Sequence, residues 1–466
     1  MSGFRQAWRG VWAVGLAAWL APALAQHWES AGVPSFMIYP YICYADTAND
    51  ALYTGSNQPF IVDGVGYYAL YRYHGGQWDT LGLFGNTIRS AIVYNDTLIV
   101  GGGFQTVHDQ PLERISCYVD GTWQSYGTFG PGIVSRLRII DGDLYALGIF
   151  DIVDGAFCNG LAKRVGGHWE PVGTLPIFNG DGSAWFLDAI NYQGQLVVTG
   201  NFTSADQTIH DIMAFNGTSW QPVCQCMTGG MDGGGSLAVY QGDLYLGGRF
   251  YFGPGNVGQG LMRWDGVQWH QVGQSDGGLQ LYDHSDQYPP TVHGFTIRDG
   301  LLLVAGAFFF ADHVPAAGVA SWDGSQWCSL GGGPASAGGF VSAMDFYQDT
   351  LYIGCGQIAE GQEVNGVARF IGSSYQGECA ATGIQETVTN VGLRVLSPRP
   401  GTIVLTGLSD GPHALRVYDA QGRLVLARPI NSTNGRTAEV QLDEQPAALY
   451  LIQVDEVQRA KYIPVQ

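Results

Sequence analysis

The 466-residue sequence predicts an all-β protein, with a seven-bladed β-propeller followed by a small Ig-like β-sandwich. Three observations lead to this prediction: a glycine-containing strand segment recurs seven times, a tryptophan motif follows it at nearly constant spacing, and the composition changes after Cys379. Charged residues make up only 13% of the chain and glycines number 69, which is typical of many short strands joined by turns.

The glycine-containing segment is a short apolar strand that runs into glycine and then phenylalanine. Clear copies occupy 98–104, 144–150, 196–202, 244–250 and 302–308, and degenerate copies begin at Leu52 and Leu351. Another apolar strand precedes the segment across a turn such as Asn95-Asp96, which is a hairpin signal.

The tryptophan motif has the pattern aromatic-Asp-Gly-x-x-Trp, as at 264–269 and 322–327. The step from the phenylalanine to the tryptophan is 19 residues in four copies and 18 in a fifth. The closing aromatic residues are Trp78, Trp123, Trp169, Trp220, Trp269, Trp327 and Tyr375. Their spacing is close to that of a four-stranded propeller blade. Such sheets bury both faces only by stacking radially into a closed ring, so we expect the glycines to permit close approach and the tryptophans to wedge between neighbours.

Two segments compete for the outer strand of the last blade. Trp28-Glu29-Ser30-Ala31-Gly32 matches the Trp-x-x-x-Gly pattern of a fourth strand but precedes the first full repeat, so it can clasp the two ends of the ring. In the alternative, Tyr375 to Cys379 forms that strand and Trp28 only packs nearby. Sequence register leaves both open.

Residues 1–25 are predicted to be a signal peptide. Arg5 and Arg9 supply the positive region, an apolar stretch covers 11–20, and a small-x-small site predicts cleavage between Ala25 and Gln26. The apolar stretch is too short for a convincing membrane span. We therefore expect a secreted or outer-membrane surface protein without a membrane span.

The net charge of −19 comes without any basic run, which excludes nucleic acid as an expected partner. Export permits disulfides among the eight cysteines, although these are scattered. Cys224 and Cys226 form C-x-C without the second half of a zinc site. For the disulfides we predict a pairing of Cys355 with Cys379 inside the last blade.

The repeats resemble those of kelch and galactose-oxidase-like propellers in their Gly-Gly and later Trp. They are more similar to exported bacterial propellers with the pattern Leu-Tyr-Val-Gly-Gly…Ala-Arg-Trp-Asp-Gly-x-x-Trp. The resemblance covers nearly all of 28–380 and implies a fold, with propeller boundaries at 26–380, but no activity.

Residues 381–391 have the composition of a linker, and 392–466 contain several alternating apolar runs that predict a β-sandwich of minimal size. This segment resembles the type A C-terminal sorting domain of the type IX secretion system of Bacteroidetes. The matching residues are Pro398, Pro400, Tyr418, Gly422, Arg423, Tyr450 and Lys461. Arg399 and Ala448 depart from the usual Asn and Gly.

This second resemblance implies the type IX secretion machinery as a partner, passage across the outer membrane, and removal of the domain afterwards in many cases. The alternative is an ordinary Ig-like accessory or adhesive module.

Two long inter-blade loops, 174–188 and 274–293, hold the candidate ligand-binding residues. These are Asp181, Trp185, Phe186, Tyr282, Asp283, His284, Asp286 and Tyr288. Aromatic and acidic side chains suit a sugar or peptide, whereas the alternative is a variable surface loop. Asn179–Ser183 and Asp283–Asp286 offer oxygens to Ca²⁺ but fit no full calcium loop, so no cofactor or metal is predicted.

Catalytic residues are not predicted. His108-Asp109, His210-Asp211 and Asp312-His313 follow the repeated phenylalanine at equivalent places, which indicates turns rather than acid–base pairs. The favoured function is a non-enzymatic binding protein for an extracellular glycan or protein. The alternative is an exported carbohydrate-active enzyme, a lyase or hydrolase, which would gather two or three ionisable residues around one pocket.

Overall fold

The computed structural model describes residues 27–34, 39–175, 184–223, 235–251, 256–273, 278–280, 289–312, 314–330, 340–356, 358–359, 362–372, 374–377, 379, 394–399, 402–406, 411–418, 424–432, 437–441, 450–455 and 458–462. The regular structure in these ranges consists of β-strands, and none of them contains a helix long and apolar enough to cross a membrane. The chain divides into two compact units, Met1–Ala381 and Thr382–Gln466.

Within the described residues, the first unit contains seven ladders of four antiparallel strands, each ordered below from its innermost strand outward. The first three ladders are β2 (Ile42–Asp46), β3 (Ala51–Gly55), β5 (Val65–His74) and β6 (Gln77–Phe84); β7 (Ile88–Tyr94), β8 (Thr97–Gly102), β11 (Ile115–Val119) and β12 (Thr122–Ser125); and β13 (Gly132–Ile140), β14 (Asp143–Phe150), β17 (Leu161–Val165) and β18 (His168–Pro171).

The other four ladders are β19 (Trp185–Tyr192), β20 (Gln195–Thr203), β21 (His210–Phe215) and β22 (Trp220–Pro222); β23 (Ser236–Tyr240), β24 (Asp243–Gly247), β25 (Leu261–Trp264) and β26 (Trp269–Gln271); β28 (Thr291–Arg298), β29 (Leu301–Ala307), β32 (Val319–Trp322) and β33 (Trp327–Ser329); and β34 (Ala343–Tyr347), β35 (Thr350–Gly354), β38 (Val367–Ile371) and β1 (His27–Ser30).

Short strands occupy loops of the first unit, and all but β27 lie between the second and third strands of a ladder. They are β4 (Phe60–Val62), β9 (Thr106–Val107), β10 (Gln110–Pro111), β15 (Ile152–Val153), β16 (Ala156–Phe157), β27 (Leu279–Gln280), β30 (Phe310–Ala311), β31 (Val314–Pro315), β36 (Ile358–Ala359) and β37 (Gln362–Glu363).

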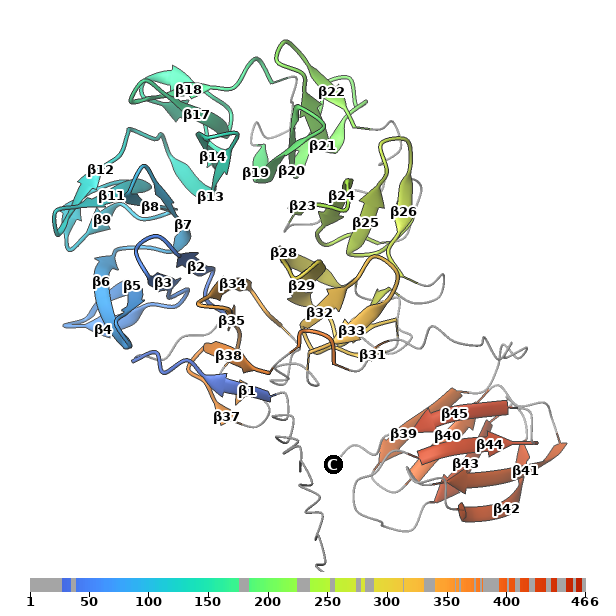
Figure 1. The fold of residues 1–466 in the computed structure, drawn as a ribbon. Coiled ribbons are helices and arrows are strands. Elements are labelled where there is room, and N and C mark those ends of the chain that lie inside the picture. Colours follow the sequence, from blue (N-terminus) through green and yellow to red (C-terminus); the bar gives the residue numbers. More distant parts are fainter. Residues whose placement is uncertain are drawn as a thin grey trace, which may run out of the picture. The chain divides into compact units, whose positions relative to one another are not determined.

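The seven ladders are arranged in a ring, with their first strands at its centre (Figure 1). These inner strands contact one another in the order β2, β7, β13, β19, β23, β28 and β34, and β34 returns to contact β2. The ring is therefore closed through its inner strands as well as at its rim.

The outer strand of the seventh ladder comes from the N-terminal side of the chain. In β1, Trp28 stands opposite Phe370 of β38, and its indole N–H donates to the Leu330 carbonyl at 3.2 Å. Glu29 accepts from Arg369 at 3.1 Å. This decides between the two alternatives in favour of the clasp, because Tyr375 lies off the ladder and donates its hydroxyl to the Asp349 carbonyl.

Several tryptophans of the outer strands join their sheet to the one before it, although the buried indole N–H of Trp220 has no hydrogen-bond partner among the described residues. Trp78, Trp123, Trp169 and Trp327 donate their indole N–H groups to the carbonyls of Ala31, Leu81, Tyr126 and Val272 at 2.8, 3.0, 2.8 and 3.4 Å. Each acceptor lies in or just after the outer strand of the preceding ladder, and Trp28 repeats this contact at the ring closure. The expected wedging is confirmed for Trp78, Trp123, Trp169 and Trp327, and Trp28 takes the place expected for Tyr375.

Two of the repeated glycines, Gly101 and Gly247, stand where the next sheet comes close, whereas Gly148, Gly200 and Gly306 face a carbonyl of their own inner strand. A Cβ atom on Gly101 would lie 2.6 Å from Val134 Cγ1, and one on Gly247 would lie 2.5 Å from Val292 Cγ1. Both valines belong to the inner strand of the following ladder. A side chain at either glycine would push neighbouring sheets apart, as the sequence predicts.

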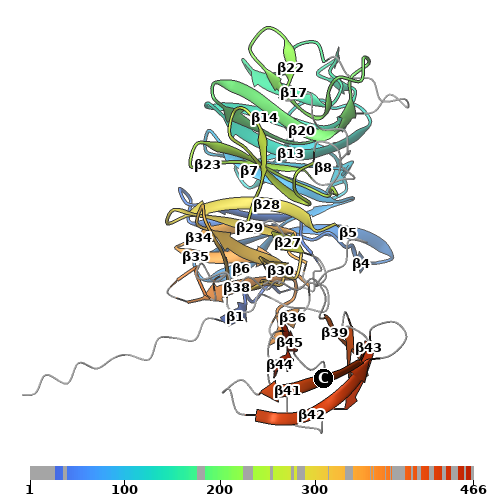
Figure 2. The ribbon, with the colours of Figure 1, turned by 90° about the vertical axis from the view of Figure 1, so that its right-hand side faces the viewer.

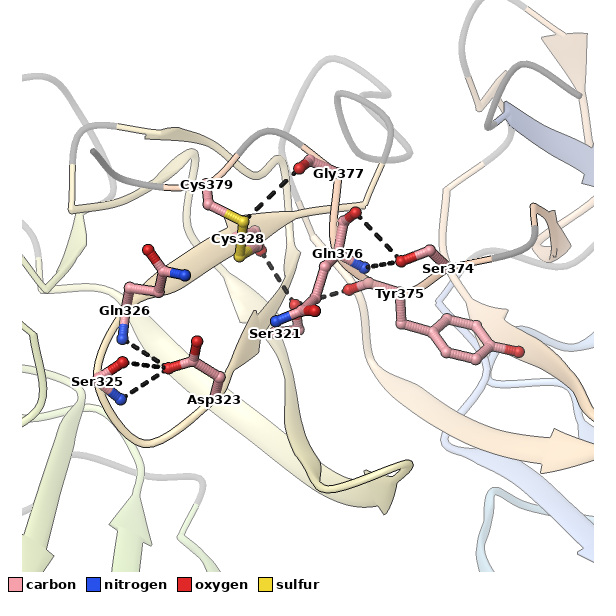
Figure 3. Close-up of a disulfide and its surroundings, with 10 residues drawn as sticks. All are labelled: Ser321, Asp323, Ser325, Gln326, Cys328, Ser374, Tyr375, Gln376, Gly377 and Cys379. Atoms are coloured by element: carbon pink, nitrogen blue, oxygen red, sulfur yellow. Dashed lines mark hydrogen bonds between the residues drawn. A yellow bond between two sulfur atoms is a disulfide. The ribbon is translucent and has the colours of Figure 1, made fainter. Parts of the chain in front are cut away.

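The predicted pairing of Cys355 with Cys379 is wrong. Cys379 forms a disulfide with Cys328 of β33 (Figure 3). Cys355 is a free, fully buried cysteine. After β38 the chain crosses to the sixth ladder, where the Gly377 amide donates to the Ser329 carbonyl at 2.8 Å. This crossing brings Cys379 opposite Cys328 and away from the core position of Cys355.

The described residues of the second unit form two sheets. One comprises β39 (Arg394–Arg399), β40 (Thr402–Thr406) and β43 (Thr437–Gln441), and the other β42 (Leu424–Ser432), β41 (Gly411–Tyr418), β44 (Tyr450–Val454) and β45 (Gln458–Tyr462) (Figure 2). Both sheets contribute to one core of Leu405, Leu415, Val417, Ile430, Val440, Ile452 and Val454.

Candidate functional site

Four inner strands carry a β-bulge at the same place, close to their N-terminal ends. The extra residues are Arg89 in β7, Ser135 in β13, Leu187 in β19 and His293 in β28. A bulge bends the strand and redirects a side chain, and bulges are over-represented beside functional sites. We call the N-terminal end of the inner strands the bulge end of the ring.

Aromatic rings accompany the bulged residues. The Arg89 guanidinium lies 4.0 Å from the centre of the Tyr41 ring, and the His293 ring lies 4.5 Å from that of Phe340. Trp185 donates its indole N–H to Ser135 Oγ at 3.0 Å. The bulge end therefore combines cationic, imidazole and aromatic groups from several sheets.

Arg89 and Arg136 are joined through their chain neighbours. The Leu137 amide donates to Ser90 Oγ at 3.0 Å, so the residues next to the two arginines are in direct contact across β7 and β13. Among the described residues, Arg89 has no hydrogen-bond or salt-bridge partner, and its Nε is buried. Arg136 Nε donates to the Leu187 carbonyl at 3.4 Å, and no described residue accepts from its two terminal nitrogens.

Arg138 forms an ion pair with Asp188 between the inner strands β13 and β19. Its guanidinium donates two hydrogen bonds to Asp188 at 2.6 and 2.7 Å, and Asp188 is fully buried while the Arg138 side chain stays 37% exposed. Burial by itself would raise the pKa of Asp188, but Arg138 and Arg136 together with the Leu237 amide hold it below its ordinary value. Asp188 is therefore a structural carboxylate that stays ionised.

Two further ionisable groups face the same centre. Burial lowers the pKa of His293, its hydrogen bond to the Val341 carbonyl at 2.8 Å opposes this, and the Arg136 charge lowers it further. Burial raises the pKa of Asp345, which accepts from the Ala45 amide at 2.8 Å, although the Arg138 charge opposes the rise. The Arg136 charge on β13 thus acts on His293 of the sixth ladder, and the Arg138 charge acts on Asp345 of the seventh.

The sum of these charges is positive. Arg136 and Arg138 act on one carboxylate with a lowered pKa, Asp188, and Arg138 acts on one with a raised pKa, Asp345. In a chain with a net charge of −19, this makes the ring centre a local cationic site.

A cavity of about 450 Å³ lies at the opposite, C-terminal end of four inner strands. It is lined by residues of β13, β19, β23 and β28, and the ionisable ones are Arg138 and Asp141. Ile139, Ile190 and Ile297 make much of its wall apolar. Trp185 at the start of β19 and Thr291 at the start of β28 stand at the other end of these strands.

The structure locates a few of the predicted ligand-binding residues. Trp185 is half-buried at the bulge end. Phe186 is fully buried in the core, 5.1 Å from Phe202, which leaves its ring unable to reach a ligand. Outside the described residues lie Asp181, Tyr282, Asp283, His284, Asp286 and Tyr288, together with the two candidate calcium segments and Cys224 and Cys226.

The predicted targeting residues are located in part. Pro398 lies in β39, Tyr418 in β41, Tyr450 in β44 and Lys461 in β45. The Tyr418 hydroxyl donates to Gln453 Oε1 at 3.3 Å. Ala25, Gln26, Pro400, Gly422 and Arg423 lie outside the described residues.

The acidic residues after the repeated phenylalanines serve turns. Asp109, Asp154, Asp211 and Asp312 have positive φ angles of 61°, 44°, 60° and 45°. Asp154 accepts from the Thr128 and Trp169 amides, each at 2.7 Å. In the described part of the chain, no group of three or more His, Cys, Asp or Glu side chains is placed to hold a metal ion.

No family model and no curated protein matches this chain. Among solved structures, it is similar to the extracellular domain of a hybrid two-component system from B. thetaiotaomicron, with 10% identity and a TM-score of 0.47 over 94% of this chain and 55% of that chain. It is also similar to a luciferin-regenerating enzyme, with 12% identity and a TM-score of 0.34 over 76% of this chain and 97% of the other.

A third similar structure is the exo-β-1,3-galactanase of Phanerochaete chrysosporium with galactose, at 11% identity and a TM-score of 0.26 over 82% of this chain and 96% of the other. This chain thus spans about 55% of the length of the first of these proteins. With TM-scores below 0.5, these similarities carry no argument about function, which depends on this chain's own residues.

Proposed function

We propose that the chain is an exported binding protein of the cell surface or the extracellular medium, and that its ligand binds at the bulge end of the ring. In this proposal residues 26–380 are a seven-bladed β-propeller, 381–391 a linker and 392–466 an Ig-like sorting domain. The ladders, the closed order of inner strands and the Trp28 clasp support the propeller part.

The observation that carries the binding function is the cationic bulge end. Arg89 and Arg136 keep unused hydrogen-bond donors there, beside the aromatic rings of Tyr41 and Trp185. Buried or half-buried guanidinium donors without acceptors are costly unless a ligand or water satisfies them. A fixed ring that presents such donors suits recognition of an extracellular glycan or protein.

Among the described residues, the hydrogen bonds of the carboxylates support binding over the alternative of a carbohydrate-active enzyme. Asp345, whose pKa burial raises, accepts from the Ala45 and Phe346 amides at 2.8 Å each. Asp188 is held by Arg138 and by the Leu237 amide at 2.9 Å, and Asp154 by two backbone amides. A general acid or base needs a proton-accepting oxygen within reach of a substrate. These carboxylates are committed to holding sheets together.

A glycan array and a peptide array probed with the purified chain test the binding function. We expect selective signals on at least one array, reduced when Arg89 is replaced by Gln. Silence on both arrays would overturn the proposal.

Export is tested by deleting 384–466 and fractionating cells. Loss of the chain from the surface and the medium is expected if this segment directs passage across the outer membrane. Unchanged appearance at the surface would leave the segment as an accessory module.

A further inference from the structure

The cavity at the C-terminal end of the inner strands lies opposite the bulge end and has its own chemistry. Its volume is about 450 Å³, and it is lined by four consecutive inner strands, β13, β19, β23 and β28, which lie around the ring centre (Figure 1). Small-molecule sites are usually cavities of about 300–1,000 Å³ with apolar walls and a few polar groups that fix the ligand's orientation. This cavity has a suitable size and both kinds of group.

The apolar wall is made of side chains that stay in contact with solvent. Ile139 and Ile297 are 41% and 48% exposed, and Ile190 and Val239, on the two strands between theirs, are half-buried. Ile139, Val239 and Ile297 occupy the same register position, opposite the leucine that opens the glycine-containing segment. Single exposed apolar residues are ordinary, but several around one concave surface are typical of a ligand-binding groove.

Two charged side chains connect β13 to β19 at this cavity. Arg138 donates to Asp188, and Asp141, in the turn after β13, accepts from Asn191 Nδ2. Arg138 and Asp141 are three residues apart, as are their two partners, so the contacts form two successive bridges between neighbouring strands. Three residues of extended chain span about 10 Å. The cavity therefore has a cation and an anion about one tripeptide length apart.

Both charged groups keep hydrogen-bonding capacity that the fold does not use. Arg138 donates to Asp188 through Nε and Nη2, so its Nη1 has no acceptor among the described residues, and its side chain is 37% exposed. The exposed Asp141 accepts through Oδ2, and its Oδ1 has no donor in the described part of the chain. Guanidinium groups bind carboxylates, and carboxylates bind ammonium groups, through charge-assisted hydrogen bonds.

We propose that this cavity binds a short apolar peptide of two or three residues with free ends. Arg138 holds the terminal carboxylate of the peptide, and Asp141 holds its terminal ammonium group. The apolar side chains of the peptide pack against Ile139 and Ile297. The ends of an extended tripeptide are about 10 Å apart, which matches the spacing of the two charged residues. This site goes beyond the function proposed above and does not rest on it.

The test is isothermal titration of the purified full chain with valyl-alanyl-valine, and with the same peptide after acetylation of its amine or amidation of its carboxylate. The free peptide is expected to bind, and each capped form is expected to bind about 10-fold more weakly because it loses one charge-assisted contact. Seryl-glycyl-serine carries the same two charges without apolar side chains, and it is also expected to bind about 10-fold more weakly.

Asp141→Asn and Asp299→Asn are a matched pair of variants. Both aspartates follow an inner strand, precede a glycine and have positive φ angles, of 53° and 52°, but Asp299 does not line the cavity. Asn adopts this conformation readily, so both variants are expected to unfold as the unaltered chain does. Asp141→Asn is expected to weaken binding of the free peptide about 10-fold and to leave that of the acetylated peptide unchanged. Asp299→Asn is expected to change neither.

Four results would overturn the inference. They are failure of the free peptide to bind, equal affinity for the free peptide and both capped forms, equal weakening by Asp141→Asn and Asp299→Asn, and binding of octanoate as tight as that of the free peptide. The last result would assign the cavity to an anionic amphiphile. Arg89→Gln is expected to leave the affinity for the peptide unchanged, because Arg89 lies at the bulge end, and this variant separates the two sites.

Discussion

The ring closure can be tested with a single substitution, Trp28→Ala. Trp28 is 1% exposed, lies 5.1 Å from the Phe370 ring and donates to the Leu330 carbonyl. Truncation of a buried Trp to Ala costs about 3–5 kcal/mol, of which about 1 kcal/mol is the net worth of the hydrogen bond. We expect the free energy of unfolding of the ring to fall by this amount in guanidinium denaturation followed by tryptophan fluorescence and circular dichroism.

Two further variants separate packing from hydrogen bonding and provide a control. Trp28→Phe keeps most apolar contact and is expected to cost about 1–2 kcal/mol, because the Leu330 carbonyl loses its donor. Trp169→Ala removes the equivalent buried indole inside the ring, with its donation to the Tyr126 carbonyl, and is expected to match Trp28→Ala. If Trp28→Ala costs less than about 1 kcal/mol while Trp169→Ala costs its full amount, β1 is not the seventh outer strand.

Two other predictions concern the disulfide and the central ion pair. Replacing Cys328 and Cys379 by Ser is expected to lower the free energy of unfolding by about 4 kcal/mol, the loop-entropy value for a separation of 51 residues, and a reducing agent should then have no further effect on the midpoint. Folding lowers the pKa of Asp188, so the pair with Arg138 stabilises the fold above the unfolded pKa of about 3.9, and this stability is lost as pH falls through the folded pKa. Asp188→Asn is expected to lower the free energy of unfolding by about 2–3 kcal/mol at pH 7, which is less than for a fully enclosed pair because Arg138 is 37% exposed. It is also expected to flatten the dependence of stability on pH below about pH 4. An unchanged acid profile would contradict this assignment.

The ring could be predicted because each repeat carries the sequence pattern of its own strands and turns. The strand that ends at Gly101, the following turn and Trp123 recur with little change in spacing, and each has a local physical role. Glycine leaves space for Val134 of the next sheet, and tryptophan donates back to the sheet before it. Such nearest-neighbour contacts repeat along the chain, so a periodic sequence predicts them.

The disulfide and the cationic bulge end were harder to predict for one shared reason. Both depend on which segments, far apart in the chain, come into contact in the folded ring. Local sequence does not predict such contacts. Cys355 is nearer to Cys379 in sequence than Cys328 is, but the return of the chain to β33 decides the pairing. A β-bulge inserts one residue and changes the alternation of a strand, so the positions of Arg89 and His293 do not follow from an in-and-out pattern.

One signal for the bulge end was nevertheless present in the sequence. Arg136 and Arg138 interrupt an otherwise apolar inner strand in a chain that has only 21 Lys and Arg residues. Charged residues are rarely buried unless they are paired or functional. Arg138 is paired with Asp188, whereas Arg136 has a single backbone acceptor among the described residues. One strand therefore carries a structural arginine and a second arginine whose remaining donors are available to a ligand.

The clasp and the disulfide act on the same junction of the ring. Trp28 donates to Leu330, which lies two residues after the disulfide-bonded Cys328, so β1 and the segment ending at Cys379 both hold the outer edge of the sixth ladder. Pairing of β1 with β38 joins residues more than 300 positions apart, and loop closure of that length opposes it entropically. A disulfide that fixes the neighbouring edge reduces the number of ways in which this junction can open.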